Sequence, residues 1–305
     1  MKKYILDLLY ETLLSVKTQK RSEKIFLLIA IASFIVHLAL IFLVNIGYIS
    51  LNDTSALFGS PIAAIYTPFS FILVYEVYLL IYYLPRSLTT YVNKQYEIIL
   101  LIIIRRLFKD LSNIKISSDW FAIKYDLQFT YDILTSLILF YLIYLFYTNS
   151  IKKNNEIISN EINIKGTSMY VRFKKIIAAS LVPVVFLLAI YSFTNWLISN
   201  TISVDSNDQS FKNINNIFFE QFFSLLIIID VILLLVSFFY TDEFHKVIRN
   251  SGFIISTILL RMSFNIEGIM NNILVIVAIL FGLIILIIHN KFELKIANNN
   301  SEINK

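Results

Sequence analysis

The sequence has no cysteine and only six glycines among its 305 residues. Without cysteine, disulfide bonds, thiolate nucleophiles, zinc–thiolate sites and iron–sulfur clusters are excluded. So few glycines leave little material for a phosphate-binding loop, and the sequence contains no H-E-x-x-H, G-x-S-x-G, Walker or G-x-G-x-x-G motif. A Gly-Tyr-Gly filter of the potassium-channel type is also missing. These absences predict a protein that is not an enzyme and needs no cofactor.

Histidine is scarce as well, with three residues in three separate segments: His37, His245 and His289. A metal site needs several ligands that converge on one point. Taken one segment at a time, these histidines give no reason to expect a metal site. His37 lies in the middle of an apolar run, and we interpret it as a buried, hydrogen-bonded side chain rather than a proton relay.

Hydrophobic residues, in contrast, make up 57% of the chain, and charged residues only 15%. Ordinary soluble domains are about half apolar. Several runs here reach the roughly 20 apolar residues that a helix needs to cross about 30 Å of hydrocarbon. The sequence therefore predicts an all-α, polytopic membrane helix bundle. The first partner that we expect for such a bundle is the lipid bilayer.

The net charge of +5 does not predict nucleic-acid binding, because cytoplasmic loops of membrane proteins are rich in lysine and arginine. The first apolar run is too long for a signal-peptide core and has no small-x-small cleavage site, so we expect it to remain as a span. The basic residues before it place the N-terminus in the cytoplasm. We expect an integral, multi-pass protein of the cell membrane.

Two classes of apolar segment occur. The six strong runs cover residues 25–48, 61–84, 128–147, 176–198, 217–240 and 270–289. Two weaker segments, 92–108 and 247–264, are shorter and contain charged residues. If both weak segments cross the membrane, the chain has eight membrane helices. If neither crosses, it has six.

The same series of features occurs twice, in residues 24–105 and 175–261. Each copy begins with an Arg-x-x-Lys step into a long apolar run, continues with an apolar run that holds one acid, and ends in a shorter run closed by arginine. With eight crossings, the chain would consist of two parallel four-helix repeats. The predicted organisation is then an interfacial helix at 1–24, repeats at 25–148 and 176–289, a cytoplasmic linker at 149–175 and a disordered cytoplasmic tail at 290–305.

Loop charge favours eight crossings, because only that arrangement keeps the Lys/Arg-rich segment 149–175 in the cytoplasm. The difficulty is segment 92–108. Its charged residues each cost about 2.5–3.5 kcal/mol at the centre of a bilayer, although much less near the interface. An interfacial or re-entrant helix at 92–108 therefore stays open as the alternative.

Charged residues inside apolar runs are the candidate functional residues, since their burial requires a partner or a water-filled cavity. Glu76 and Asp230 occupy equivalent places in the two copies. Arg105 and Arg261 close the next helix of each copy and are the expected partners. Two interpretations follow: each pair locks its four-helix bundle, or each acid takes part in ion- or proton-linked transport.

Three further charged residues have lower rank. Glu97 lies two helical turns before Arg105 and could also pair with that arginine. The second copy has Phe253 at the position equivalent to Glu97. Arg106 is a substitute partner for Glu76. Asp132 falls near the end of a run, where solvent is close, so no special role is expected.

The sequence favours two functions from different classes. The first is an ion channel or transporter with acidic residues near the bilayer midplane, since a duplicated bundle with paired acids is a common way to build such a site. The second is a non-transporting membrane subunit or sensor that acts through a membrane or cytoplasmic protein partner. Homo-oligomerisation is left open by both.

Overall fold

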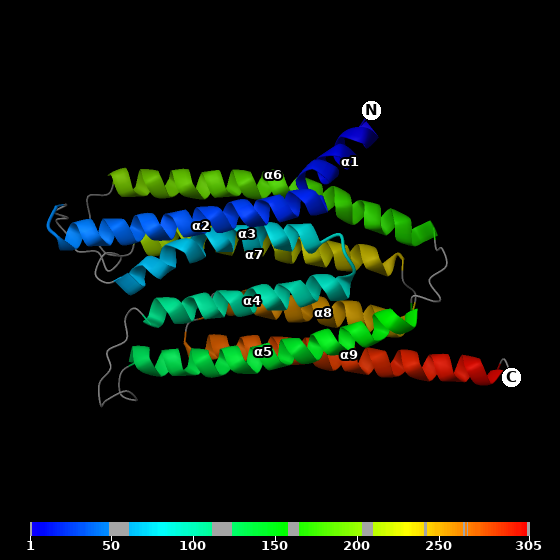
Figure 1. Cartoon of the computed structure of the whole chain (residues 1–305). Helices are drawn as coiled ribbons and strands as arrows, with labels where there is room; N and C mark the ends of the chain where they lie inside the picture. Colours follow the sequence, from blue (N-terminus) through cyan, green and yellow to red (C-terminus); the bar gives the residue numbers. More distant parts are fainter. Residues whose placement is uncertain are drawn as a thin grey trace. The chain divides into compact units, whose positions relative to one another are not determined.

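The computed structural model describes residues 2–48, 61–111, 124–157, 165–202, 210–240, 243–264, 266 and 268–303. Every secondary-structure element in these ranges is a helix. In chain order the helices are α1 (Lys2–Leu13), α2 (Val16–Asn45), the 3₁₀ helix η1 (Pro61–Ile65), α3 (Tyr66–Tyr83), α4 (Leu88–Leu111), α5 (Lys124–Ile157), α6 (Lys165–Ile202), α7 (Ser210–Phe238), α8 (Phe244–Ser263) and α9 (Ile269–Ile303) (Figure 1).

Five stretches of described helix are long and apolar enough to cross a membrane. They are Leu8–Asn45, Asp126–Ser150, Met169–Tyr191, Gln221–Phe238 and Ile269–Ile296. The chain is therefore a helical, multi-pass integral membrane protein, which confirms that part of the prediction. The strong run at 61–84 forms η1 and α3, with a shorter apolar stretch at Thr67–Tyr83.

The two weak segments both form helices, α4 and α8, but neither is apolar over a full membrane width. A spanning helix and an interfacial helix have the same backbone, so helix formation does not distinguish eight crossings from six. The number of crossings and the repeat arrangement stay predictions.

Several helices extend beyond the apolar runs. Helix α9 continues to Ile303, so the prediction of a disordered tail after residue 289 is wrong. Much of the predicted linker is also helical, because α5 runs to Ile157 and α6 begins at Lys165. The physical reason is composition: these ends are polar, but they contain no proline, and their lysine and glutamate residues continue a helix readily.

At the N-terminus, the expected helix over 1–24 is divided at Ser15. This residue has extended backbone angles (φ −76°, ψ 156°), and its hydroxyl accepts a hydrogen bond from the backbone N–H of Thr18 at 3.1 Å. Ser15 therefore caps α2, which then continues without a break into the first apolar run. The Tyr78 hydroxyl donates to the Leu13 carbonyl oxygen (2.9 Å) and holds the end of α1 against α3.

The chain forms two compact units, each made of discontinuous segments. Unit 1 comprises residues 1–82, 100–136 and 178–218, and unit 2 comprises 83–99, 137–177 and 219–305. Helices α4, α5, α6 and α7 contribute to both. The units are contact clusters rather than sequence repeats.

Unit 1 contains α2, η1 and α3 with parts of other helices. His37 is buried, and its Nδ1 lies against the Thr67 hydroxyl. The Gln19 amide donates to the Tyr75 hydroxyl at 2.8 Å. Phe69 of α3 stacks on Phe108 of α4 with ring centroids 5.1 Å apart. These contacts hold α2 and α4 against α3.

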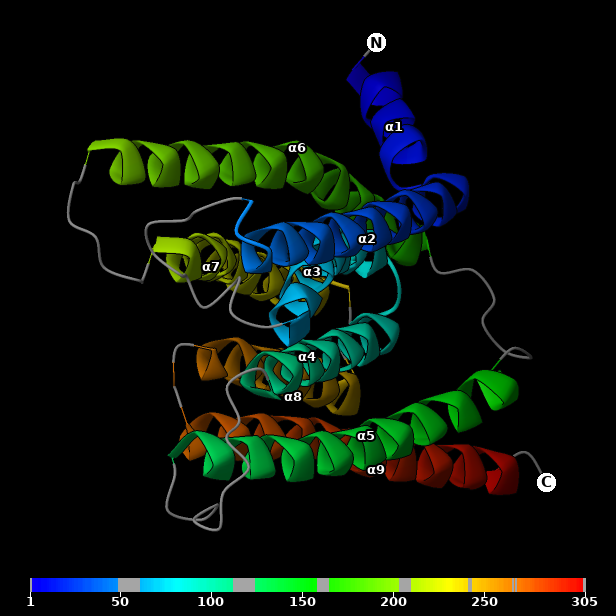
Figure 2. The same ribbon diagram turned by 60° about the vertical axis from the view of Figure 1, so that its left-hand side comes forward.

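Unit 2 is built around α8 and α9, which run side by side (Figures 1 and 2). The hydroxyl of Ser256 donates to the Ala278 carbonyl oxygen at 2.6 Å, and it also lies 2.6 Å from the Tyr96 hydroxyl. The Tyr96 ring meets Phe146 of α5 edge to face, with centroids 5.0 Å apart. Side chains from α4, α5, α8 and α9 thus form one buried core.

At Gly282, the backbone of α9 lies very close to two side chains of this core. A Cβ atom at Gly282 would lie 1.9 Å from the Tyr96 hydroxyl oxygen and 3.0 Å from the Ser256 hydroxyl oxygen. Only glycine leaves room here for the Tyr96–Ser256 hydrogen bond.

We therefore expect Gly282→Ala to lower the stability of the protein by about 1–3 kcal/mol, the usual cost of overpacking a core. Tyr96→Phe removes the oxygen that the new methyl group meets. The Gly282→Ala/Tyr96→Phe double variant should thus be less destabilised than the two single losses added together. Thermal unfolding of the detergent-purified variants measures both effects, and simple additivity would contradict the proposed clash.

Candidate functional site

The predicted site residues Asp230 and Arg261 are brought together inside unit 2. The Nη1 atom of Arg261 lies 2.8 Å from Oδ2 of Asp230, and the side chains are 2% and 0% exposed. Asp230 comes from the apolar part of α7 and Arg261 from the last turn of α8. A cation in the last turn of a helix is also favoured by the helix dipole.

Two hydroxyl groups complete the surroundings of the Asp230 carboxylate. The Tyr91 hydroxyl of α4 donates to Oδ1 at 3.1 Å, and the Thr257 hydroxyl of α8 donates to Oδ2 at 3.3 Å. Thr257 precedes Arg261 by four residues, which places both on one face of α8. Asp230 is thus bound by groups from two neighbouring helices.

The guanidinium group of Arg261 has a second partner on α4. Its Nη2 donates to Oε1 of Gln95 at 2.9 Å. Gln95 follows Tyr91 by four residues, so α4 also presents two polar side chains on one face. We call Tyr91, Gln95, Asp230, Thr257 and Arg261 the polar core of unit 2.

Two donors of the polar core have no hydrogen-bond acceptor among the described residues: Nε2 of Gln95 and Nη1 of Arg261. Arg261 Nη1 is close enough to Asp230 for an ion pair, but its N–H groups do not point at the carboxylate oxygen well enough for a hydrogen bond. Buried polar atoms without partners are uncommon in proteins. Water or a polar ligand is the usual explanation.

A second cation adds to the charge of this region. Lys174 of α6 is 3% exposed, and its ammonium group is electrostatically attracted by the Asp230 carboxylate. Its Nζ donates to the Arg86 carbonyl oxygen at 3.0 Å and lies 4.6 Å from the centre of the Tyr170 ring. One buried carboxylate is therefore in contact with the buried Arg261 and also attracts a second buried cation, Lys174.

The other predicted pair, Glu76 and Arg105, lies in unit 1. Glu76 is 5% exposed, and Arg105 is close enough for its positive charge to act on the Glu76 carboxyl group. Electrostatic attraction between the two is therefore present.

Arg106, predicted as a substitute partner for Glu76, binds Asp132. Its Nε and Nη2 atoms lie 2.5 and 2.7 Å from the two carboxylate oxygens, a bidentate arrangement. Gln128 donates to the same carboxylate at 2.8 Å. The expectation that Asp132 lies near solvent without a special partner is wrong, since its side chain is fully buried.

Glu97 is held within its own helix. Its two carboxylate oxygens accept from the Asn93 amide at 3.0 Å and from Lys94 Nζ at 2.5 Å. Its side chain is 36% exposed. The predicted pairing of Glu97 with Arg105 stays a prediction.

Tyr91, Gln95 and Thr257 were not predicted as site residues. A signal was present, since Tyr91 with Gln95 and Thr257 with Arg261 are both polar pairs at a spacing of four. Comparison with protein-family models, with curated proteins and with solved structures gives no match. The function has to be argued from these side chains.

The Asp230–Arg261 pair predicts a specific pattern of stability. Asp230→Asn and Arg261→Gln should each cost about 3–5 kcal/mol, because each leaves a buried charge without its partner. The double variant should recover part of the combined loss. Thermal unfolding of the detergent-purified proteins measures the cycle.

Glu97→Gln is the matched control, since exposed ion pairs contribute at most about 1 kcal/mol. Strictly additive losses at positions 230 and 261 would show that the two charges do not stabilise one another.

Proposed function

We propose that this integral membrane protein is an ion channel or transporter, and that the polar core of unit 2 is the site that binds the ion. Ionisable groups within apolar helices are costly and are usually retained for function. Asp230 lies inside the apolar stretch Gln221–Phe238, far from either end of it. The single observation that carries the proposal is the buried Nε2 donor of Gln95, which has no acceptor among the described residues and belongs to the side chain that binds Arg261.

The chemistry of the polar core favours a small anion. Gln95 Nε2 is an N–H donor, and it requires a ligand with lone pairs, whereas Arg261 Nη1 already lies 2.8 Å from an Asp230 carboxylate oxygen. Arg261 and Lys174 together supply more positive charge than Asp230 neutralises. A hydrated small anion would satisfy the Gln95 donor and balance the charge. In this scheme Asp230 holds Arg261 in place and keeps the affinity low enough for release.

Gln95→Glu tests this scheme. The substitution preserves the oxygen that accepts from Arg261 but replaces the N–H donor by a negatively charged oxygen. We expect purified protein in liposomes to conduct or exchange small anions such as chloride or nitrate, and Gln95→Glu to reduce that flux at least tenfold. The Asp230→Asn/Arg261→Gln variant should fold and lose the flux.

Gln19→Glu is the matched control, because it makes the same chemical change at a residue of α2 in unit 1 and should leave the flux unchanged. Wild-type protein that passes no anion and no cation under any gradient would contradict a transport function. Flux of cations alone would contradict the choice of anion.

The second candidate function is a non-transporting subunit or sensor that binds another membrane protein. It is favoured by an open, shallow surface pocket of about 240 Å³ in unit 1, whose apolar lining includes Leu27, Ala30, Phe34, Pro68 and Ile72. An apolar lining suits a lipid chain or a partner helix better than an ion. Isolation from native membranes with a stoichiometric partner would support this function, and robust flux by the protein alone would exclude it as the main role.

Both functions depend on the topology, for which we propose eight crossings in two parallel repeats. Positions 115 and 160 lie outside the described residues. Because the chain has no cysteine, Lys115→Cys and Asn160→Cys each create a single reactive site. We expect a membrane-impermeant thiol reagent to label position 115 from outside and position 160 only after the membrane is opened. The reverse result would establish six crossings.

A further inference from the structure

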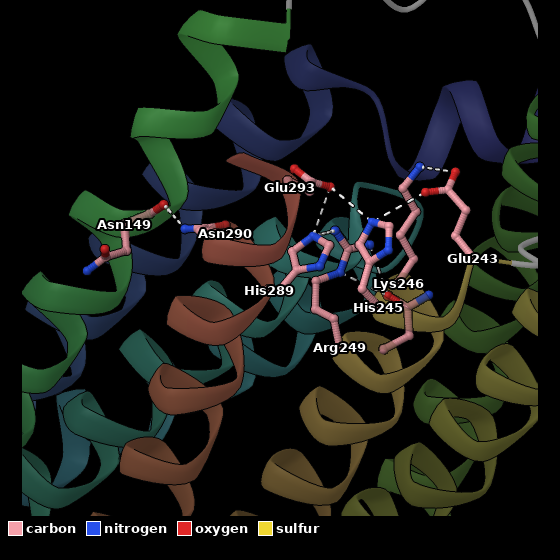
Figure 3. A network of polar contacts seen from close by, with 9 residues as sticks. Asn149, Glu243, His245, Lys246, Arg249, His289, Asn290 and Glu293 are labelled. Atoms are coloured by element: carbon pink, nitrogen blue, oxygen red, sulfur yellow. Dashed lines mark hydrogen bonds and ion pairs between the residues drawn. The ribbon is translucent and has the colours of Figure 1, made fainter. Parts of the chain in front are cut away.

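A second cluster of titratable side chains lies in unit 2, where the start of α8 meets the later part of α9 (Figure 3). His245 and Glu243 belong to the start of α8, and His289 and Glu293 to α9. Ligand atoms of His245, His289 and Glu293 all lie within 4.8 Å of one another. The two imidazole rings are nearly parallel, with centroids 5.2 Å apart.

The distances within this cluster match the spacing of ligands around one metal ion. Glu293 Oε1 lies 3.1 Å from His289 Nε2 and 3.9 Å from His245 Nε2. Glu243 Oε2 lies 3.3 Å from the same nitrogen of His245. Ligand atoms that surround a zinc ion tetrahedrally at about 2.0–2.2 Å are themselves roughly 3.3–3.6 Å apart. Small movements of the His245, His289 and Glu293 side chains, together with displacement of Arg249 from His289 Nε2, separate the cluster from that geometry.

We infer that His245, His289 and Glu293, with Glu243 as a fourth ligand, form a binding site for a divalent transition-metal ion, with zinc the best match. Two imidazole nitrogens with carboxylate oxygen are a common zinc ligand set. Such nitrogen and oxygen ligands also bind cobalt or nickel. The sequence prediction of no metal site considered the histidines singly and overlooked that Glu293 follows His289 by four residues.

The surroundings of the cluster resemble the outer shell of a metal site. Lys246 binds the second oxygen of Glu243 at 2.7 Å and orients that carboxylate. A cavity of about 40 Å³ adjoins the two histidines and is otherwise lined mainly by apolar side chains such as Phe244 and Ile288.

Arg249 already places a positive charge at the cluster. Its Nη1 lies 2.9 Å from His289 Nε2, while its Nε and Nη2 donate to the Asn250 side-chain oxygen at 3.2 and 3.1 Å. His289 Nε2 therefore already has a cation beside it. The guanidinium group also competes with the metal, because both require the same nitrogen lone pair. Metal binding therefore displaces Arg249 from His289.

The test uses full-length protein, purified in detergent with an affinity tag that contains no histidine and freed of metal by a chelator. Zinc is titrated against a chromophoric competitor, and cobalt is added separately to record its visible absorption. We expect one ion per chain and a cobalt spectrum typical of tetrahedral nitrogen and oxygen ligands. His289→Ala and Glu293→Gln should each weaken zinc binding at least tenfold.

His37→Ala is the matched control, because it removes the only other histidine of the chain and should leave the affinity unchanged. Arg249→Gln should bind zinc more tightly than the wild type, since the competing cation is gone. Wild-type protein without stoichiometric zinc and cobalt binding would overturn the inference. So would an equal loss of affinity in His37→Ala and His289→Ala.

Discussion

A charged side chain between apolar helices is stable only where an opposite charge and hydrogen-bond partners meet it, and this requirement organises the interior of both units. In unit 2, Asp230 and Arg261 are neighbours that solvent barely reaches. In unit 1, Arg106 and Asp132 form a two-point contact. Such pairs add little net stability compared with apolar residues of similar size. Their effect is to select which helix faces can pack together, because any other pairing leaves two charges without partners.

The all-helical membrane class could be predicted because it depends on a local property, the length of uninterrupted apolar sequence. Helix ends could not be predicted in the same way. The apolar signal stops near residue 289 in α9 and near 147 in α5, but both helices continue through polar residues. A contact between the two helices supports the extension, since the Asn290 amide donates to the Asn149 carbonyl oxygen at 3.0 Å. Hydropathy contains no information about such contacts.

The candidate site was predictable only in part. The meeting of Asp230 and Arg261 was accessible because two similar segments repeat the same order of charges. Tyr91 binds Asp230 and Gln95 binds Arg261, but both lie more than 130 residues before Asp230 in the chain. They come from α4, whose placement in the membrane could not be predicted. No local sequence pattern therefore connects them to Asp230. Asp132 was misjudged for a different reason: its position near the end of an apolar run was read as exposure, whereas Arg106 covers it.

Helix α9 is attached to the rest of unit 2 at several heights along its axis. Near its start, the Asn271 amide donates to the Ser263 and Ile266 carbonyl oxygens at 2.8 and 2.9 Å. Eleven residues later, about 16 Å along the helix, Gly282 lies beneath the Tyr96 hydroxyl. Two turns further, His289 meets Arg249 of α8. A slide of α9 along α8 by even one residue, about 1.5 Å, would disrupt all three attachments at once. The three contacts therefore fix α9 in one register against both α8 and α4.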